Sequence, residues 1–366
     1  MLQNSVMKNI KLSIYFFLLV ILVSCKEKIN PTPVPPTVAD TTFIRAADMS
    51  FIPEIESTGT LFKFNGNAED PLVTLSRAGC NYIRLRLWHT PLDGHSGINE
   101  VKYLASRIHQ QGMKLWISVH FSDTWADPSN QTKPSAWQNL NFNSLNSAVG
   151  NYMSTVATEL QPDLIQIGNE TNDGFLWPDG KLSVNQAQCL YLMKTAIDTV
   201  RNKLPQTKIM LQFGGITGSE WFFGKVQTLN YDYIGISYYP IWHGTNLDNL
   251  KNKINYLSQT YQKKVLIAET AYPFTLGWND WTNNIVGLQN QLIPGFEATN
   301  DGQKNYVLNI KSWSKQSSSC IGFCYWGGEW ISFRGAQATD GSSWENQALW
   351  DFNNNALPVI GAFNEN

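Results

Sequence analysis

The sequence has few charged residues and few histidines, and its charges nearly cancel. Charged residues make up 15% of the 366 positions, 27 Lys and Arg stand against 29 Asp and Glu, and the net charge is −2. This balance provides no electrostatic footprint for binding nucleic acid. With five His and no His-Glu-x-x-His motif, a catalytic metal is not expected. No glycine-rich phosphate fingerprint follows any apolar run, which argues against a nucleotide-binding fold.

Cysteine is scarce, and its spacing indicates neither a metal site nor a redox pair. Besides Cys25, the chain has Cys80, Cys189, Cys320 and Cys324, and none of them forms a Cys-x-x-Cys motif. If Cys320 and Cys324 share one strand, they lie about 13 Å apart at roughly 3.3 Å per residue. A disulfide between them is then excluded by its geometry. We therefore expect buried free thiols.

The N-terminal segment has the pattern of a secretory signal. Lys8 and Lys11 precede an apolar run over residues 14–23, which is too short to span a bilayer as a mature helix. The run ends in Leu-Val-Ser-Cys, which resembles the bacterial lipobox, where cleavage leaves a lipid-modified cysteine. We expect residues 1–24 to be removed and Cys25 to be lipidated. The alternative is an ordinary signal peptide whose cysteine is incidental.

A proline-rich stretch follows the expected cleavage point. Pro31, Pro33, Pro35 and Pro36 favour an extended polyproline II conformation, so residues 25–42 are interpreted as a tether. A domain held off a membrane in this way acts outside the cytoplasm. The sequence therefore predicts a protein anchored in the bacterial cell envelope, at the outer membrane or the cell surface, with its folded domain over residues 43–366.

The folded domain alternates short apolar runs with amphipathic helical stretches. The helical stretches include residues 99–110, 186–203, 248–261 and 303–316. The apolar or β-branched runs cover residues 43–44, 82–88, 114–121, 164–168, 208–213, 233–238, 265–268 and 321–326. Eight such units over roughly 280 residues match a (β/α)8 TIM barrel better than a doubly wound sheet. The fold class predicted is therefore α/β, with a single (β/α)8 catalytic domain.

In such barrels the chemistry lies at the C-terminal ends of the strands, and two glutamates end apolar runs here. Glu170 closes LIQIGNE and Glu269 closes VLIAE, 99 residues further on, which is three units of about 33 residues. We therefore place them on strands four and seven, across the mouth of the barrel. Such a pair suits retaining glycoside hydrolysis, with one carboxyl as acid/base and the other as nucleophile. The alternative is that either Glu forms a salt bridge at the rim.

Arg84 and Arg86 alternate with apolar neighbours on the second strand, so their side chains should point into the barrel. A buried guanidinium needs a carboxylate partner. Its charge would also keep Glu269 ionised, whereas Glu170 must hold a proton to act as an acid. The alternative for Arg84 is packing in the barrel floor.

Tryptophan is the abundant residue type, with 14 in the chain. Trp116 and Trp313 are expected in the core. The others that we place at or just beyond strand ends are Trp88, Trp125, Trp177, Trp242, Trp278, Trp326 and Trp330. Because the faces of sugar rings stack on aromatic side chains, these positions predict a carbohydrate-binding face.

The same strand ends resemble glycoside hydrolase family 53, the arabinogalactan endo-β-1,4-galactanases of clan A. The resembling stretches are AADMSFIPEIE, NYIRLRLWHTP, VHFSDTWADP, IQIGNET, ISYYPIWHG, IAETAYPFT and FCYWGGEW, in order over residues 44 to about 350. VHFSDTWADP and IAETAYP are specific, whereas Gly-Asn-Glu alone would indicate only the clan. The resemblance implies retaining endo-hydrolysis of β-1,4-galactosidic bonds in (arabino)galactan.

The resemblance also implies roles for individual residues. Glu170 would be the general acid/base and Glu269 the nucleophile. Asn169 would bind the sugar 2-hydroxyl, Tyr238 would donate a hydrogen bond to the nucleophile, and Arg86, or failing that Arg84, would flank it. The residues expected to line the subsites are Asp48, His120, Asp123, Trp125 and Trp326.

No cofactor is expected, although a structural calcium occurs in some relatives. Asp301 and Asp340 offer oxygen ligands, but without a ligand-spacing signature, so a turn and a helix N-terminus are the simpler interpretation. The expected partner is galactan, bound by a monomer. Two alternatives remain: a clan A hydrolase of another β-glycan such as mannan or xylan, and a non-catalytic glycan-binding lipoprotein.

Overall fold

Eight parallel strands close into a barrel in the computed structural model, which describes residues 43–364. In chain order they are β1 (Ile44–Asp48), β4 (Tyr82–Leu87), β5 (Lys114–Val119), β6 (Leu164–Ile167), β7 (Lys208–Gly214), β8 (Tyr233–Ser237), β9 (Lys264–Thr270) and β10 (Cys320–Tyr325). β1 pairs with both β4 and β10, which closes the cylinder. All eight predicted strands and the (β/α)8 class are confirmed. The predicted segment 1–42 lies outside the described residues.

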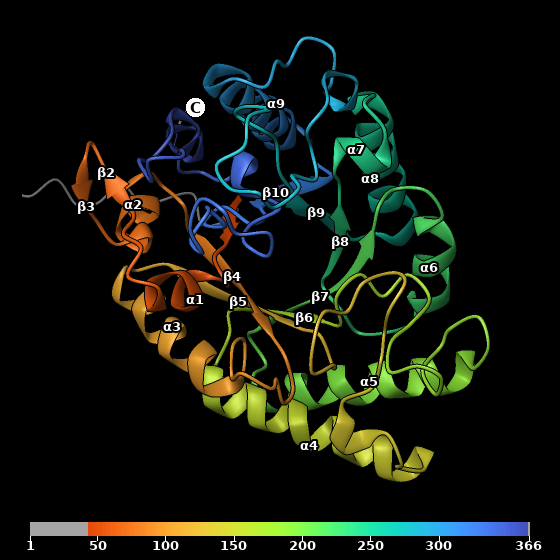
Figure 1. Cartoon of the computed structure of the whole chain (residues 1–366). Coiled ribbons are helices and arrows are strands. Elements are labelled where there is room, and N and C mark those ends of the chain that lie inside the picture. The colour runs from red at the N-terminus through yellow and green to blue at the C-terminus, as the bar shows by residue number, and fades with distance from the viewer. Residues whose placement is uncertain (1–42, 365–366) are drawn as a thin grey trace, which may run out of the picture. The chain divides into compact units, whose positions relative to one another are not determined.

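Helices surround the strands, as Figure 1 shows. The long ones are α3 (Ile98–Gln110), α4 (Phe142–Leu160), α5 (Gln186–Lys203), α8 (Leu247–Tyr261) and α9 (Asn300–Gln316). The shorter ones are α1 (Ile52–Ser57), α2 (Pro71–Arg77), α6 (Ser219–Val226) and α7 (Pro240–His243), and a small hairpin joins β2 (Lys63–Phe64) to β3 (Asn67–Ala68). After β10, a 3₁₀ segment, Pro358–Phe363, takes the place of an outer helix. Its Phe363 packs against Phe323 of β10. Within residues 43–364, no helix is long and apolar enough to cross a membrane.

Apolar side chains fill the N-terminal part of the barrel interior, and polar side chains fill the C-terminal part. The inner apolar cluster includes Trp116, Tyr82, Met210 and Cys324, and Trp116 is fully buried there as predicted. A second, larger core lies between the strands and the helices. Trp313, expected in the core, is partly buried against it. The polar layer at the C-terminal end carries the candidate site.

The cysteines behave as expected. Cys320 and Cys324 share β10, and all four described cysteines are free and buried. Their thiols therefore fill core volume.

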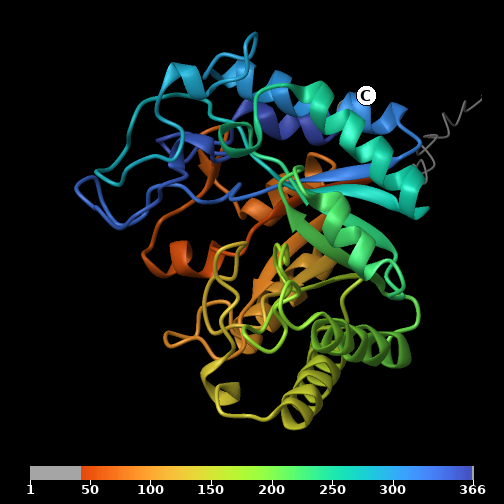
Figure 2. The same ribbon diagram turned by 90° about the vertical axis from the view of Figure 1, so that its right-hand side faces the viewer.

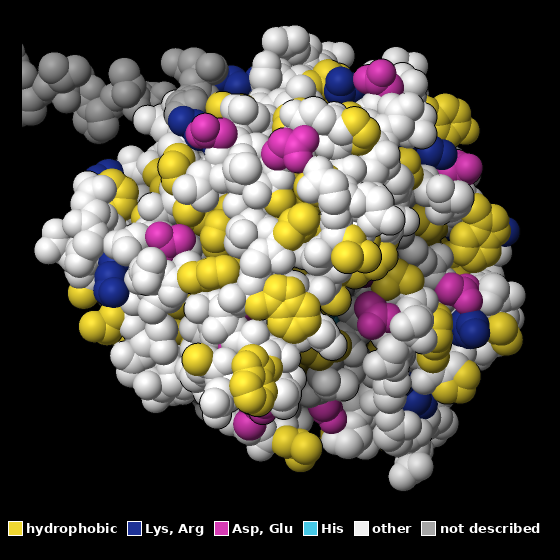
Figure 3. All heavy atoms as spheres, turned by 45° about the horizontal axis from the view of Figure 1, so that its top comes forward, with side chains coloured by type: hydrophobic (Ala, Val, Ile, Leu, Met, Phe, Trp, Pro, Cys, Tyr) yellow, Lys and Arg dark blue, Asp and Glu magenta, His cyan; other side chains and the backbone are white. Residues whose placement is uncertain are grey.

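The loops after the last strands extend from one end of the barrel. Figure 2 shows the segments after β9 and β10, coloured cyan to blue, on the same side of the strands. On the face shown in Figure 3, hydrophobic side chains gather in the middle, whereas Lys and Arg lie scattered toward the outline. This distribution agrees with the near-neutral charge, and no basic patch appears on that face.

Candidate active site

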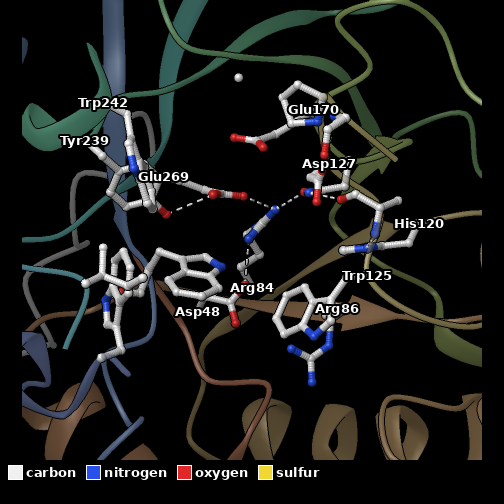
Figure 4. A pocket seen from close by; sticks show the side chains of 18 of the residues that line it. Asp48, Arg84, Arg86, His120, Trp125, Asp127, Glu170, Tyr239, Trp242 and Glu269 are labelled. Carbon is white, nitrogen blue, oxygen red and sulfur yellow. Dashed lines mark hydrogen bonds and ion pairs between the residues drawn. The ribbon is translucent and has the colours of Figure 1, made fainter. Parts of the chain in front are cut away.

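A pocket of about 590 Å³ opens at the C-terminal end of the barrel, with its floor on the polar layer. Figure 4 shows the Glu170 and Glu269 carboxyl groups both turned into it, from opposite sides. The side chains that line the pocket include Asp48, Arg84, Arg86, His120, Trp125, Asp127, Asn169, Glu170, Tyr239, Trp242, Glu269, Trp326, Trp330 and Trp344. Both candidate catalytic glutamates therefore lie in one cavity.

A bulge in β9 turns Glu269 into the pocket. Val265 and Ile267 pack in the outer core, whereas Leu266 and Ala268 belong to the barrel interior. Strict alternation would therefore send the next residue, Glu269, outward. The register of β9 shifts by one residue against both of its neighbours, before Glu269 on the β8 side and before Thr270 on the β10 side. The extra residue re-aims the Glu269 side chain inward.

Three donors hold the Glu269 carboxylate. Oε1 accepts from Nη2 of Arg84 at 2.7 Å and from Nε2 of Gln212 at 3.0 Å. Oε2 accepts from the hydroxyl of Tyr239 at 2.9 Å. Glu269 is only 5% exposed, and the three donors fix the position of its carboxylate. This arrangement suits a nucleophile, whose attacking oxygen must be held in place.

Arg84 connects the carboxylates of the polar layer. Nη1 donates to Oδ2 of Asp48 at 2.7 Å, and Nη2 donates to Oδ1 of Asn169 at 2.8 Å as well as to Glu269. Burial alone would lower the pKa of Arg84, but Glu269 and Asp48 together raise it above its usual value. Arg84 is thus a permanently charged clamp, and packing in the barrel floor is wrong as its sole role.

Arg84, the alternative expected to flank the nucleophile, does so, whereas the first choice, Arg86, is wrong. Arg86 points into the barrel as predicted. It lies two residues further along β4 than Arg84, and Arg84 is the residue that lies opposite Asp48 of β1. The Nε of Arg86 donates to the Ser96 hydroxyl at 2.8 Å. Its guanidinium lies against aromatic rings, among them Trp125 at 4.2 Å. The extra two residues raise it above the layer that holds Glu269.

Glu170 has the opposite electrostatic environment from Glu269. It follows β6 in a left-handed backbone conformation with φ of 46°, and its backbone N–H donates to Oε1 of Gln212 at 3.1 Å. Burial, together with the negative charge of Glu269, raises the pKa of Glu170 to about 8. The carboxyl therefore holds a proton at neutral pH, as a general acid must.

Gly214 leaves room for the Glu170 side chain. A Cβ at Gly214 would lie 2.8 Å from Cδ of Glu170 and 2.9 Å from its Oε1. Gly214 ends β7, and its backbone is held by two hydrogen bonds with the Asn172 side chain. A side chain at this position would displace the Glu170 carboxyl.

The Asn169 side chain is fixed between β4 and the loop after β5. Its Oδ1 accepts from Arg84, and its Nδ2 donates to the carbonyl of Ala126 at 2.8 Å. It lines the pocket beside Glu170. Its expected contact with a sugar 2-hydroxyl stays a prediction.

Tyr239, and not Tyr238, donates to Glu269, so the expectation for Tyr238 is wrong. The inward positions on β8 are Tyr233, Gly235 and Ser237, and continued alternation brings Tyr239 into the pocket. Tyr238 points the other way, and its hydroxyl donates to the carbonyl of Gly244 at 2.5 Å. Counting inward positions from the buried end of β8 would have identified Tyr239 from the sequence.

Of the two polar residues expected after β5, His120 lines the pocket and Asp123 does not. Nδ1 of His120 accepts from the backbone N–H of Ala126 at 3.2 Å, and burial next to Arg86 and Arg84 holds its pKa well below the usual value. The ring is therefore neutral, and its Nε2–H is available to a ligand. The Asp123 carboxylate accepts from Thr90 and Ser135 instead, which fastens two loops together.

Aromatic rings make up much of the pocket wall. Trp125, Trp242, Trp326 and Trp330 lie where the sequence placed them, and Trp125 and Trp242 are 36% and 55% exposed. Trp88, Trp177 and Trp278 are not among the lining residues.

Several lining residues were not predicted, among them Trp344, Asp127 and His243. Trp344 packs edge-on against Trp326 with ring centroids 4.8 Å apart, but it comes from the long loop after β10. Gln212 was also missed, although it touches both glutamates. Its position two residues after the inward Met210 was the available signal.

The two calcium candidates have ordinary structural surroundings. Asp301 lies in the first turn of α9, and Asp340 is paired with Arg334 at 2.9 Å. Within residues 43–364, no group of three or more His, Cys, Asp or Glu residues could hold a metal ion.

Comparison with known proteins places this architecture in a family. The sequence model of glycosyl hydrolase family 53 matches residues 44–363. An arabinogalactan endo-beta-1,4-galactanase of Cellvibrio japonicus is 34% identical over 344 residues, which covers 88% of this chain and 91% of that one. An endo-beta-1,4-galactanase of Bacillus subtilis is 28% identical and covers 88% of this chain and 85% of that one.

Solved structures agree with the sequence relatives. The GH53 catalytic domain of Ignisphaera aggregans superposes with a TM-score of 0.83 at 36% identity, covering 91% of this chain and 98% of that one. A fungal beta-1,4-galactanase superposes with a TM-score of 0.77 at 26% identity, covering 88% and 99%. With its eight-stranded barrel and a pair of glutamates facing one pocket, the chain belongs to glycosyl hydrolase family 53.

Proposed function

We propose that this protein is a retaining endo-β-1,4-galactanase that cleaves (arabino)galactan, with Glu170 as general acid/base and Glu269 as nucleophile. The observation that carries the proposal is the contrast between the two carboxyls in one pocket. Burial raises the pKa of Glu170 to about 8, whereas Arg84, Gln212 and Tyr239 all donate to Glu269. Family membership and galactanase relatives support the choice of galactan.

The two carboxyls would act in a double displacement. In the first step a Glu269 oxygen attacks the anomeric carbon, the bond to the leaving sugar breaks, and the Glu170 proton passes to the leaving oxygen. In the second step Glu170, now a base, takes a proton from water, and the water oxygen displaces Glu269 from the same carbon. Configuration is retained because each step inverts it once. These side chains supply all the proton transfers, so the reaction calls for no cofactor.

Hydrolysis of purified β-1,4-galactan by the isolated protein tests this proposal. We expect a rapid fall in chain length, release of oligosaccharides, and β-configured reducing ends visible by proton NMR before mutarotation. A parallel panel of mannan and xylan separates the galactanase from another clan A hydrolase. Galactan that binds but keeps its length would instead support the non-catalytic glycan-binding protein.

Tyr239 and Tyr238 form a matched pair for testing how the nucleophile is held. Tyr239→Phe removes the hydrogen bond to Glu269, and a hydrogen bond to a charged group contributes about 1.5–3 kcal/mol. We therefore expect kcat/KM on galactan to fall roughly 10- to 100-fold. Tyr238→Phe removes a hydroxyl that bonds Gly244 outside the pocket, so its kcat/KM should stay within about threefold of the wild type. Equal losses in the two variants would contradict this assignment of Glu269's partner.

We also propose that the protein is attached to the bacterial cell envelope through a lipidated Cys25. The support is the lipobox-like sequence ending at Cys25 and the proline-rich tether that follows it. Anchored in this way, the barrel would meet galactan outside the cytoplasm.

Cys25→Ser tests the anchor. The wild-type chain, expressed in a bacterium with lipoprotein processing, should partition into detergent, because acyl chains supply the membrane affinity. The variant should move to the aqueous phase. The N-terminal peptide of the wild type should begin at Cys25 and carry the mass of the acyl groups. The same partition for both proteins, with no acylated peptide, would overturn the anchor.

A further inference from the structure

Two buried glutamines lie next to the catalytic pocket without lining it. Gln166 of β6 and Gln212 of β7 each follow an inward apolar residue by two positions, so both side chains point into the barrel. Both are 0% exposed, and neither belongs to the residues that line the pocket. They are therefore out of reach of a bound sugar, and any part that they play in the reaction must act through the residues that they hold.

The Gln212 amide joins the two catalytic residues. Its Oε1 accepts from the backbone N–H of Glu170 at 3.1 Å and from Nε2 of Gln166. Its Nε2 donates to the Ser237 hydroxyl at 3.0 Å and to Oε1 of Glu269 at 3.0 Å. An amide offers two acceptor sites and two N–H donors, so all four are used here. The amide thus spans the distance between the Glu170 backbone and the Glu269 carboxylate.

The partners of Gln212 also decide which way round its amide lies. A reversed amide would set its NH₂ group against the Glu170 N–H and its oxygen against the Glu269 carboxylate. Both contacts would be repulsive in a buried site, where unpaired polar groups are costly. The donor on the other side of the Gln212 oxygen is supplied by Gln166.

Gln166 is itself held in one orientation. Its Oε1 accepts from Nε of Arg84 at 3.4 Å, and its Nε2 donates to the carbonyl of Gly168 at 3.0 Å as well as to Gln212. A guanidinium can only donate and a backbone carbonyl can only accept, so these two partners fix the end of the amide that faces Gln212. Arg84 also donates to Glu269 at 2.7 Å, which closes a ring of hydrogen bonds through both glutamines.

Gln166 has one further contact, but the residue there is held independently. Nε2 of Gln166 lies 3.2 Å from Oδ1 of Asn169. Asn169 keeps a bond of 2.8 Å from Arg84 and one of 2.8 Å to the carbonyl of Ala126 without it. Gln212, in contrast, would lose one of the two donors to its oxygen. The main effect of removing Gln166 therefore falls on Gln212.

We propose that Gln166 is a positioning residue for the reaction: it orients the Gln212 amide, which holds the Glu269 carboxylate in a fixed place relative to Glu170. This inference rests on the proposed function. In a double displacement both carboxyls act on one glycosidic bond, and their separation matters for the outcome. Loss of Gln166 should therefore slow the chemical step and leave the binding of galactan unchanged.

Methionine substitutions test the proposal, because methionine is unbranched and adaptable in a core but lacks the amide. The variants are Gln166→Met, Gln212→Met and the two combined. Gln303→Met is the matched control: Gln303 is also 0% exposed, and it bonds the Tyr325 hydroxyl and backbone carbonyls outside the pocket. For each protein, kcat and KM on galactan are measured together with the melting temperature.

We expect kcat to fall roughly 10- to 100-fold in Gln212→Met, which removes a hydrogen bond to a charged group, and roughly five- to tenfold in Gln166→Met, which removes one between neutral groups. KM should stay within about twofold of the wild type in both. Gln303→Met should keep its kcat within about twofold although its melting temperature falls. An equal loss of kcat in Gln303→Met, or a change in KM alone in Gln166→Met, would overturn the proposal.

The combined variant tests whether Gln166 acts through Gln212. If it does, kcat of the combined variant stays within about twofold of that of Gln212→Met, because the second substitution has nothing left to disturb. Losses that multiply would show that Gln166 acts independently, and would overturn the proposal. If Gln166→Met does not fold, Gln166→Asn takes its place, since it keeps a buried amide that is one methylene too short to reach Gln212.

NMR of the side-chain amides separates this inference from the proposed function, because it needs no turnover. In protein labelled with ¹⁵N-glutamine, the Gln212 amide signal is identified by its loss in Gln212→Met. It should shift in Gln166→Met and stay in place in Gln303→Met. Such a shift supports the orientation of Gln212 by Gln166 even if galactan is not cleaved. An unchanged signal in Gln166→Met overturns it, even if the wild type cleaves galactan.

Discussion

Glu269→Ala is expected to lose turnover of galactan by a factor on the order of 10⁵, because it removes the carboxylate that forms the covalent bond to the anomeric carbon. The loss should appear in kcat, since the side chain acts in the transition state. The fold should survive, although Arg84 loses one of its two carboxylates and keeps Asp48. Reducing-end assays with near-UV circular dichroism check both statements.

Azide distinguishes the role of Glu269 from a merely structural one. In Glu269→Ala the small anion can occupy the vacated space and attack an aryl β-galactoside with a good leaving group. The product should be the α-galactosyl azide, because only one displacement takes place. Rescue that yields the β-azide would assign Glu269 to the acid/base role instead. Glu345→Ala is a control, because Glu345 is also a buried glutamate but lies outside the main pocket.

Glu170→Ala is expected to reduce kcat on galactan by roughly 10²–10⁴-fold, the usual contribution of a general acid. The loss should depend on the leaving group. A sugar leaving group needs the Glu170 proton, whereas a dinitrophenolate leaves without one, so the first step on an activated aryl glycoside should be nearly unaffected. The second step then becomes limiting, and a burst of phenolate should precede slow turnover. A similar loss on both substrates would contradict the acid/base assignment.

The pH profile should report the proton on Glu170. The first step needs the protonated carboxyl, and burial raises the pKa of Glu170 to about 8. We therefore expect kcat/KM to fall as pH rises through about 8, since the free enzyme loses the proton there. An alkaline limb centred near the ordinary carboxyl pKa would contradict this environment for Glu170.

The pH dependence of stability reports the same Glu170 proton, and its measurement does not require turnover. Between the ordinary carboxyl pKa of 4.5 and about 8, the native protein keeps a proton that the unfolded chain has released. The native state thus binds more protons in this window, so this group lowers stability as pH rises through it. Glu170→Gln removes the effect. Its melting temperature relative to the wild type should rise from pH 4.5 to pH 8.

The resemblance predicted most of the pocket. For the partners of Glu269, however, it favoured Arg86 over Arg84 and Tyr238 over Tyr239. Both arginines of β4 were expected inside the barrel, and both are there. Alternation cannot tell which of them lies at the height of Glu269, because that depends on how β4 is staggered against β1 and β9. The pairing of Arg84 with Asp48 across β1 and β4 settles it. Tyr238 and Tyr239 are adjacent, so a prediction that misses the inward set of β8 by one residue selects the wrong side chain.

Asp123 and Trp344 show why the positions of loop residues could not be predicted from the sequence. Asp123 lies three residues after His120, but the chain turns at Phe121, where φ is 55°, and the carboxylate meets Thr90 and Ser135. Trp344 reaches the pocket from a loop that begins after β10, nearly twenty residues before it. Such positions depend on loop closure over long stretches, and no local periodicity records them.

The barrel, its eight strands, the free buried thiols and the two glutamates at one end could all be predicted from the sequence. These follow from local patterns, because strands and helices bury one face at a fixed period and parallel strands in a barrel end at the same rim. The direction of the Glu269 side chain, the arginine that holds it and the contacts of Gln212 with both glutamates became visible only in the folded chain. Those outcomes depend on a one-residue bulge and on the stagger between strands, which arise when distant segments pair and which no single segment encodes.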